Sequence, residues 1–186
     1  MGSVADARSE APDRRGEGLL ADSFVCSICG EEHEGLPTDW AFTLPDDVWA
    51  IPEPKRSEVA RFNKDLCQLG ERYFMRCVLE IPFSDRDGFF GWGAWAEVEW
   101  SVFERYLEMY EREGWEEPLH KGTLANALSA YPDSFGTPVL IQFRESTKRP
   151  SLHALPDDPS VLAMEQRQGI DGLRFHEIAA LLSTDG

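Results

Sequence analysis

Two long alternating segments, joined by a short polar turn, constrain the fold of this chain more than any other feature. Residues 73–83 and 89–99 carry apolar side chains at alternating positions, and the turn 84–88 between them ends in Gly88. A period of two is typical of β-strands, and a short loop with glycine joins antiparallel strands. We therefore predict a β-hairpin. Because both faces of residues 73–83 are partly apolar, we expect this strand to be central in its sheet.

Helices and further strands are expected around this hairpin. Ser101 and Glu104 have the spacing of a capping box, which predicts a helix that continues to Gly114. The other expected elements are strands at 66–69, 137–145 and 150–155, and helices that begin at Asp158 and Asp171. Strands grouped in the middle of a chain, with helices between and after them, favour an α+β fold with a mainly antiparallel sheet and packed helices.

The composition divides the chain into two parts. Residues 1–22 have no sustained apolar periodicity and are expected to form a disordered leader. The remainder, 23–186, contains most of the aromatic residues of a chain that is 42% hydrophobic and has six Trp and eleven Phe. We expect it to form a single α+β domain with a zinc-knuckle-like loop at its N-terminal end.

Cys26 and Cys29, followed by Gly30, are the strongest indication of a metal site. Two residues between two cysteines allow both thiolates to bind one zinc ion, and glycine permits the tight turn that follows. A closed structural site needs two further ligands, for which His33 and Cys67 are our preferred candidates. A redox dithiol or two unreactive thiols are the alternatives. We expect Cys77 to be a buried strand residue rather than a ligand.

The charge of the chain limits its partners. It has 34 acidic and 18 basic residues, a net charge of −16, which repels phosphate backbones and anionic lipids. Nucleic acid is therefore an unlikely partner, and a basic protein surface, a cationic ligand or a metal is favoured, although such a charge can also serve solubility alone. No segment is apolar enough for a membrane helix or a signal peptide, so we expect a cytoplasmic protein.

No catalytic constellation stands out. His120, His153 and His176 are isolated from one another, and no nucleophile motif accompanies them. Trp92 and Trp95 lie at positions of opposite parity in the expected strand, so we expect them on opposite faces, filling the core rather than lining a ligand groove.

Ordered motifs along the chain resemble a known family. These motifs are Phe-x-Cys-x-x-Cys-Gly-x-x-His-x-Gly-Leu-Pro at 24–37, Asp65-Leu66-Cys67, Tyr73–Arg76 with Leu79–Pro82, Gly91–Trp95, Tyr131-Pro132, Arg149-Pro150 and Ala163–Ile170. Together they resemble the uncharacterised bacterial family called domain of unknown function 2199, over about residues 24–182. The resemblance implies that Cys26, Cys29, His33 and Cys67 all occupy motif positions, which favours zinc binding, and that Cys77 stands where the family pattern has glycine. It implies no known activity.

Three classes of function are compatible with these features. The first is a non-catalytic protein-binding or regulatory module with a structural zinc site, and one specific form is an immunity-like protein that masks a basic surface. The alternative is a hydrolase-like enzyme with a pocket near the aromatic hairpin, in which Glu165, Arg167 and His153 act as acid, base and anion-binding groups. A third possibility, zinc-dependent nucleic-acid binding, requires a local basic patch.

Overall fold

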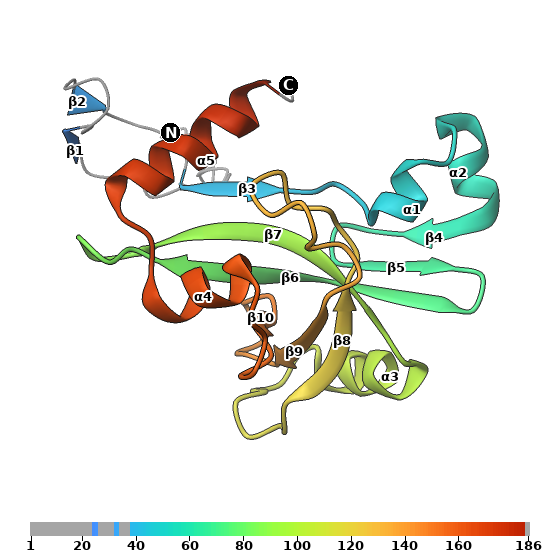
Figure 1. Ribbon diagram of the computed structural model, residues 1–186. Coiled ribbons are helices and arrows are strands. Elements are labelled where there is room, and N and C mark those ends of the chain that lie inside the picture. The colour runs from blue at the N-terminus through green and yellow to red at the C-terminus, as the bar shows by residue number, and fades with distance from the viewer. Residues whose placement is uncertain (1–23, 26–31, 34–37, 185–186) are drawn as a thin grey trace, which may run out of the picture.

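Five strands of the computed structural model, which describes residues 24–25, 32–33 and 38–184, close into a small barrel (Figure 1). They are β6 (Arg72–Pro82), β7 (Phe89–Val98), β8 (His120–Leu124), β9 (Pro138–Gln142) and β10 (Ser151–Ala154). Each pairs with the next, and β10 pairs with β6 to close the ring. The pairing of β10 with β6 is parallel, and the other four are antiparallel.

The remaining strands extend this barrel or lie apart from it. β3 (Asp39–Ala41) pairs in parallel with β7, while β5 (Leu66–Leu69) and β4 (Ala60–Phe62) continue the sheet beyond β6 in antiparallel fashion. β1 (Phe24–Val25) and β2 (Glu32–His33) form a separate antiparallel pair. The predicted α+β class with a mainly antiparallel sheet is thus confirmed, as is the hairpin of β6 and β7. The closure into a barrel was not predicted.

The two long strands each divide one edge between two partners. The edge of β7 opposite β6 pairs with β3 at Gly91–Gly93 and with β8 at Ala96 and Glu97. The corresponding edge of β6 pairs with β5 up to Met75 and with β10 at Val78 and Leu79. Because β5 stops pairing with β6 at Met75, the edge of β6 beyond this residue is open to β10. The chain entering β10 therefore lies alongside the middle of β6, where the Val78 amide donates to the carbonyl of Pro150 at 2.9 Å.

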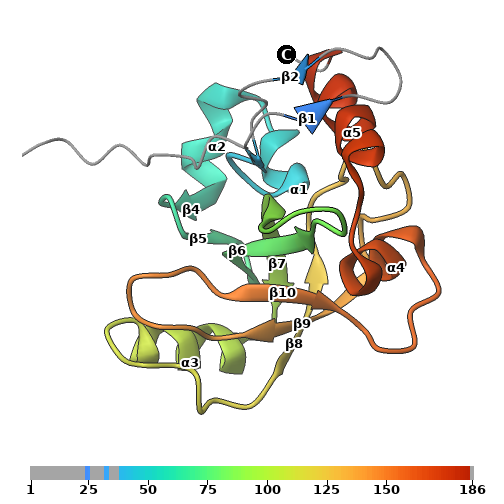
Figure 2. The ribbon, with the colours of Figure 1, turned by 90° about the vertical axis from the view of Figure 1, so that its left-hand side faces the viewer.

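Helices cover the barrel from several sides. They are α1 (Asp46–Trp49), α2 (Glu53–Val59), α3 (Trp100–Met109), α4 (Val161–Gln168) and α5 (Gly172–Thr184). Figures 1 and 2 show α3 and α5 on opposite sides of the barrel, with α4 beside the barrel strands. α4 packs on β6 and β10, and Phe175, Ile178 and Leu182 of α5 are buried in the core.

Two helix starts differ from the sequence prediction. α3 begins at Trp100 with Glu99 at its N-cap and without a side-chain cap, so Ser101 does not form the expected capping box, and the helix ends at Met109 rather than near Gly114. In α4 the cap is Ser160, whose hydroxyl accepts from the amide of Ala163 at 3.2 Å, and not Asp158. Asp158 instead accepts from the Ser160 amide at 2.8 Å and so supports the residue that caps the helix.

The alternation of β6 separates core from surface. Met75, Cys77, Leu79 and Ile81 are fully buried in the main apolar cluster, in which Trp92 also lies, whereas Trp95 lies in a second cluster, as predicted from their spacing. On the opposite face of β6, Val78 and Glu80 line a surface cavity. Gly93 serves the packing of strands, because a Cβ atom there would lie 2.9 Å from the Cβ of Ala41 on β3.

Candidate functional site

The predicted zinc ligands are only partly within the described structure. Cys26 and Cys29 lie outside the described residues, and of His33 the structure gives only the backbone, which pairs with Phe24. Cys67 on β5 is 1% exposed in the second apolar cluster, and burial raises the pKa of its thiol to about 11. Among the described residues, no group of three or more His, Cys, Asp or Glu side chains is placed to hold a metal ion. The four-ligand zinc site therefore stays a prediction.

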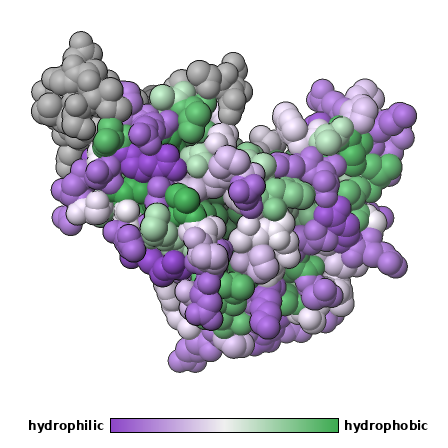
Figure 3. Space-filling view, viewed as in Figure 1, coloured by the Kyte–Doolittle hydropathy of each residue, from purple (hydrophilic) through white to green (hydrophobic). Residues whose placement is uncertain are grey.

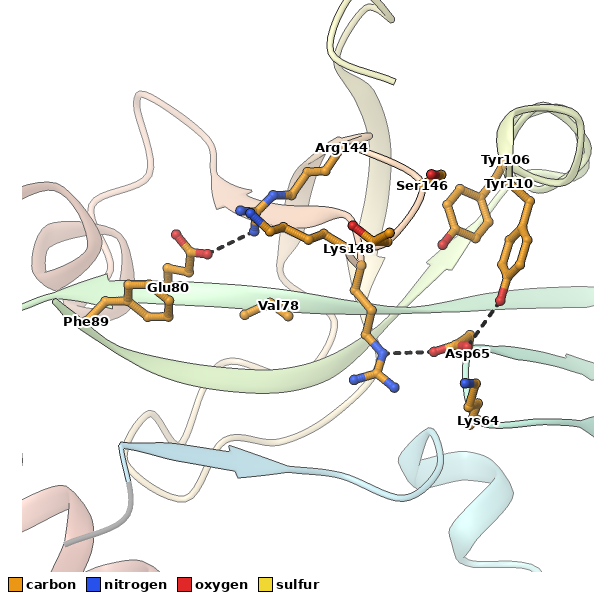
Figure 4. Close-up of a pocket in the computed structure, with 12 residues that line it drawn as sticks. Lys64, Asp65, Val78, Glu80, Phe89, Tyr106, Tyr110, Arg144, Ser146 and Lys148 are labelled. Carbon is orange, nitrogen blue, oxygen red and sulfur yellow. Dashed lines mark hydrogen bonds and ion pairs between the residues drawn. The ribbon is translucent and has the colours of Figure 1, made fainter. Parts of the chain in front are cut away.

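A cavity of about 660 Å³ on the outer face of β6 is rich in cationic side chains (Figure 4). The lining comes from the turn before β5, from β6 and β7, from α3 and from the loop that joins β9 to β10. It consists of Lys64, Asp65, Val78, Glu80, Phe89, Tyr106, Tyr110, Arg144, Ser146, Thr147, Lys148 and Arg149. Four of these residues are cations and two are carboxylates, in a chain whose net charge is −16. The local excess of positive charge is therefore opposite in sign to the charge of the whole chain.

Asp65 holds one side of this cavity in place. Its carboxylate accepts from Nε of Arg149 at 2.8 Å and from the hydroxyl of Tyr110 at 3.3 Å, and its residue is 8% exposed. These bonds join the β9–β10 loop and the residue that follows α3 to the turn before β5. Because only Nε of Arg149 is used, the terminal nitrogens of the guanidinium remain as potential donors to a ligand.

Glu80 holds the opposite side. Its Oε1 accepts from NH1 of Arg144 at 3.0 Å, and Figure 4 shows Arg144 and Lys148 extending over the cavity between Glu80 and the tyrosines. Nε of Arg144 is buried and has no hydrogen-bond partner. Because this Nε is not accessible, only the terminal nitrogens of the Arg144 guanidinium could donate to an anion in the cavity.

Arg76, the β6 residue between Met75 and Cys77, adds to the positive charge next to this cavity. Its pKa is lowered, first by burial and then by the nearby positive charge of Arg149, which Asp65 only partly offsets. Its Nε is also buried without a hydrogen-bond partner. Since two like charges are held close together in a partly buried place, a bound anion would relieve their repulsion.

The described lining of this cavity supplies hydrogen-bond donors for an anion. It offers guanidinium, ammonium and hydroxyl donors, while its two carboxylates are already engaged by arginines. Ser146 and Thr147 are its aliphatic hydroxyls, and neither histidine nor cysteine belongs to the described lining to activate them. An arrangement of this kind suits a carboxylate or a phosphate group.

The residues considered for a hydrolase-like enzyme are engaged separately. Both oxygens of Glu165 are occupied, by the hydroxyl of Tyr131 at 2.5 Å and by Nε of Arg174 at 2.8 Å. Arg167 donates to two backbone carbonyls, those of Pro156 and Asp158. His153 lines a different cavity, and Trp92 and Trp95, near which the catalytic pocket was expected, are fully buried. The structure does not bring the three proposed groups together.

The sequence reasoning missed the residues that form the cationic cavity. The available signal was the segment 144–149, in which three of six residues are basic although the whole chain has only 18 Lys and Arg. Asp65 and Arg149 were noted as parts of two motifs far apart in the sequence, and the structure places them in an ion pair with a distance of 2.8 Å. Periodicity does not reveal this pair, because it depends on the path of the β9–β10 loop past β5.

The surface seen in Figure 3 mixes hydrophobic and hydrophilic side chains. Figure 3 shows that hydrophobic side chains on this face form small patches separated by hydrophilic ones. Within the described part of the chain, none of the helices combines the length and the apolarity that crossing a bilayer requires.

An α+β fold with a closed five-stranded barrel and a cationic surface cavity defines the class of this protein. The chain belongs to a bacterial family described as "Uncharacterized protein conserved in bacteria (DUF2199)", whose model matches residues 25–170. This match confirms the resemblance derived from the motifs. Comparison with curated proteins and with solved structures gives no match.

Proposed function

We propose that this chain is a non-catalytic binding module that holds an anionic group of its ligand in the cavity between Asp65 and Glu80. The observation that carries this function is the concentration of Lys64, Arg144, Lys148 and Arg149 around one concave site of a strongly acidic chain. Electrostatic repulsion among these four cationic side chains costs free energy, and a bound anion offsets that cost. The small extent of the positive region favours a small anion over a nucleic-acid polymer.

Binding of inorganic phosphate tests this function directly. Isothermal titration calorimetry on the full chain should give one site, and the variant Lys148→Gln should bind about 5- to 10-fold more weakly because one charge-assisted contact is lost. Lys148 is exposed and pairs only with Glu145 at the surface, so its loss should leave the fold intact. Lys55→Gln, which removes an exposed lysine on α2, is the matched control. Absence of phosphate binding, or equal effects of both variants, refutes an anion site here.

A second proposal concerns a basic protein partner, which would include an immunity-like role. It is supported by five exposed glutamates on α3 and the segment after it: Glu104, Glu108, Glu111, Glu113 and Glu116. Exposed Leu107, Trp115 and Leu119 lie in the same part of the chain and would supply apolar contact. Charge reversal of Glu108 and Glu111 to lysine should abolish capture of a basic partner at low salt, whereas capture that is unaffected would refute this surface.

The structural zinc site remains part of the proposal. The pairing of Phe24 with His33 brings together the two ends of the segment that contains Cys26 and Cys29, which supports the use of His33 with the cysteine pair. We also propose a cytoplasmic location, where cysteines stay reduced, so that the thiols of Cys26, Cys29 and Cys67 would be free to bind the metal.

A further inference from the structure

A second cavity continues the cationic one along the outer face of β6. Its volume is about 410 Å³, and it shares Glu80 and Phe89 with the first cavity. The rest of its lining is Pro82, Gly88, Ser151, Leu152, His153 and Gln166. The two cavities therefore adjoin at Glu80 and Phe89, and together they are called the elongated site.

The two halves of this elongated site differ in chemistry. Among the residues that the structure describes, four Lys and Arg side chains line the first half and none lines the second. The second half is instead lined by the apolar side chains of Pro82 and Phe89 and by the polar side chains of Ser151, His153 and Gln166. A ligand that fits both halves has an anionic end and an uncharged, flatter end.

Phe89 is suited to contact a planar ring. It is 45% exposed at the start of β7 and belongs to the lining of both cavities. Figure 4 shows its ring next to Glu80, at the end of the first cavity away from Tyr110. Exposed aromatic rings at such positions act as platforms on which nucleobases stack.

Glu80 lies between the cationic half and this aromatic platform. One of its oxygens accepts from Arg144 at 3.0 Å, which holds the carboxylate in position. A carboxylate oriented in this way can accept hydrogen bonds from a ribose hydroxyl, as acidic residues do in dinucleotide-binding sites. The order along the site is thus cations, then a carboxylate acceptor, then an aromatic ring.

We propose that the ligand of this site is a ribonucleoside monophosphate. The phosphate binds among Lys64, Lys148 and Arg149, the ribose hydroxyls donate to Glu80, and the base lies on Phe89 in the second cavity. This inference rests on the proposed function, since it uses the same cationic cavity. A free nucleotide fits better than a nucleic acid, because the polymer would bring further phosphates toward a chain with a net charge of −16.

Calorimetric titrations of the full chain with four probes test this inference. They are inorganic phosphate, ribose 5-phosphate, AMP and GMP. If a base stacks on Phe89, at least one nucleotide should bind about 10-fold or more tightly than ribose 5-phosphate, the usual contribution of one stacked base. The 2′-deoxy form of that nucleotide should bind about 5-fold more weakly, because one hydroxyl donor is missing.

Two variants assign these gains to residues. Phe89→Leu should weaken nucleotide binding by about 5- to 10-fold and leave phosphate binding unchanged. Phe62→Leu is the matched control, because Phe62 on β4 is 44% exposed and lies outside both cavities. Glu80→Gln should reduce the difference between the ribo and deoxy nucleotides to less than about 2-fold, since the charged acceptor is lost.

The outcomes separate this inference from the function on which it rests. If phosphate binds and both nucleotides bind no more tightly than ribose 5-phosphate, the nucleotide inference is overturned while the anion site stands. If a nucleotide binds tightly but Phe89→Leu and Phe62→Leu behave alike, the base lies elsewhere and the inference is also overturned. If none of the four probes binds, both the site and the inference fail.

Discussion

Asn126 is a buried side chain whose removal should destabilise the fold strongly. It is fully buried just after β8, where its Oδ1 accepts from the backbone amide of Trp95 at 2.8 Å. Its Nδ2 donates to the carbonyl of Leu44 at 3.0 Å and to Oδ1 of Asp46 at 2.7 Å. One amide group therefore connects β7 with the chain between β3 and α1.

The magnitude follows from the groups that Asn126→Ala would leave unpaired. The amide of Trp95 and the carbonyl of Leu44 would both lose a partner in the interior, and each buried unsatisfied group costs about 1–3 kcal/mol. Asp46 is only partly buried, so its carboxylate can bind water instead, and the loss of its hydrogen bond to Asn126 adds little to the cost. We expect the free energy of unfolding to fall by about 3–5 kcal/mol, a large share of the roughly 5–15 kcal/mol of a typical domain.

Urea unfolding measures this loss. With a slope of about 2 kcal/mol/M, a loss of 3 kcal/mol lowers the midpoint by about 1.5 M. Asn63→Ala is the matched control. The side-chain oxygen of Asn63 accepts from the backbone amides of Asp65 and Leu66, but Asn63 lies in an exposed turn, where water can replace its side chain. The control should cost less than about 1 kcal/mol. A loss below about 1 kcal/mol for Asn126→Ala, or equal losses in both variants, would refute the reasoning.

Three further predictions test other parts of the molecule. Gly93→Ala should lower the free energy of unfolding by about 1–3 kcal/mol in urea, because the added Cβ would lie 2.9 Å from the Cβ of Ala41. Gly91→Ala is the control and should be near neutral, because its Cβ would lie 3.5 Å from the nearest atom. Equal effects of the two variants would contradict the close approach of β3 to β7. His120 has its pKa lowered below 6.5, chiefly by burial, so the unfolded state binds a proton that the folded state does not, and stability should fall as the pH drops through about 6.5. His120→Phe should reduce this fall between about pH 7.5 and 5.5 in thermal unfolding, and an unchanged pH dependence would show that His120 is not its source. Metal analysis of the purified chain should find about one zinc ion, lost in Cys26→Ser and kept in Cys77→Ser, and a metal-free wild-type chain would refute the zinc site.

The hairpin shows how much of the fold was accessible from local sequence. The period-two pattern of residues 73–83 predicted the strand, and the short turn at 84–88 predicted its antiparallel partner. The apolar residues on both faces predicted its central place in the sheet. The opposite parity of Trp92 and Trp95 predicted for the same reason that they lie on opposite faces, and the structure places them in different apolar clusters. Local patterns were weaker at helix starts, where Glu99 and Ser160 hold positions that were assigned to Ser101 and Asp158.

β8 shows where local sequence was insufficient. Its residues, His120–Leu124, include Lys121 and Gly122, which obscure the alternation of a strand. Gly122 is needed because a Cβ atom there would lie 3.0 Å from the carbonyl oxygen of Glu97 and 2.9 Å from Ile141. The glycine is thus explained by the neighbouring strands of the closed barrel, which the sequence of this segment does not indicate.

The sequence by itself determined the α+β class, the hairpin, the acidic character of the chain and the cysteine pair that favours zinc, since all of these depend on composition or on neighbours a few residues apart. Only the tertiary structure decided that the barrel closes, that Asp65 pairs with Arg149 at 2.8 Å and that Glu80 pairs with Arg144 at 3.0 Å. The physical reason is the parallel pairing of β10 with β6, which lays the 143–150 loop across strands more than 60 residues earlier in the chain. The positive cavity in this negative chain exists because of that pairing.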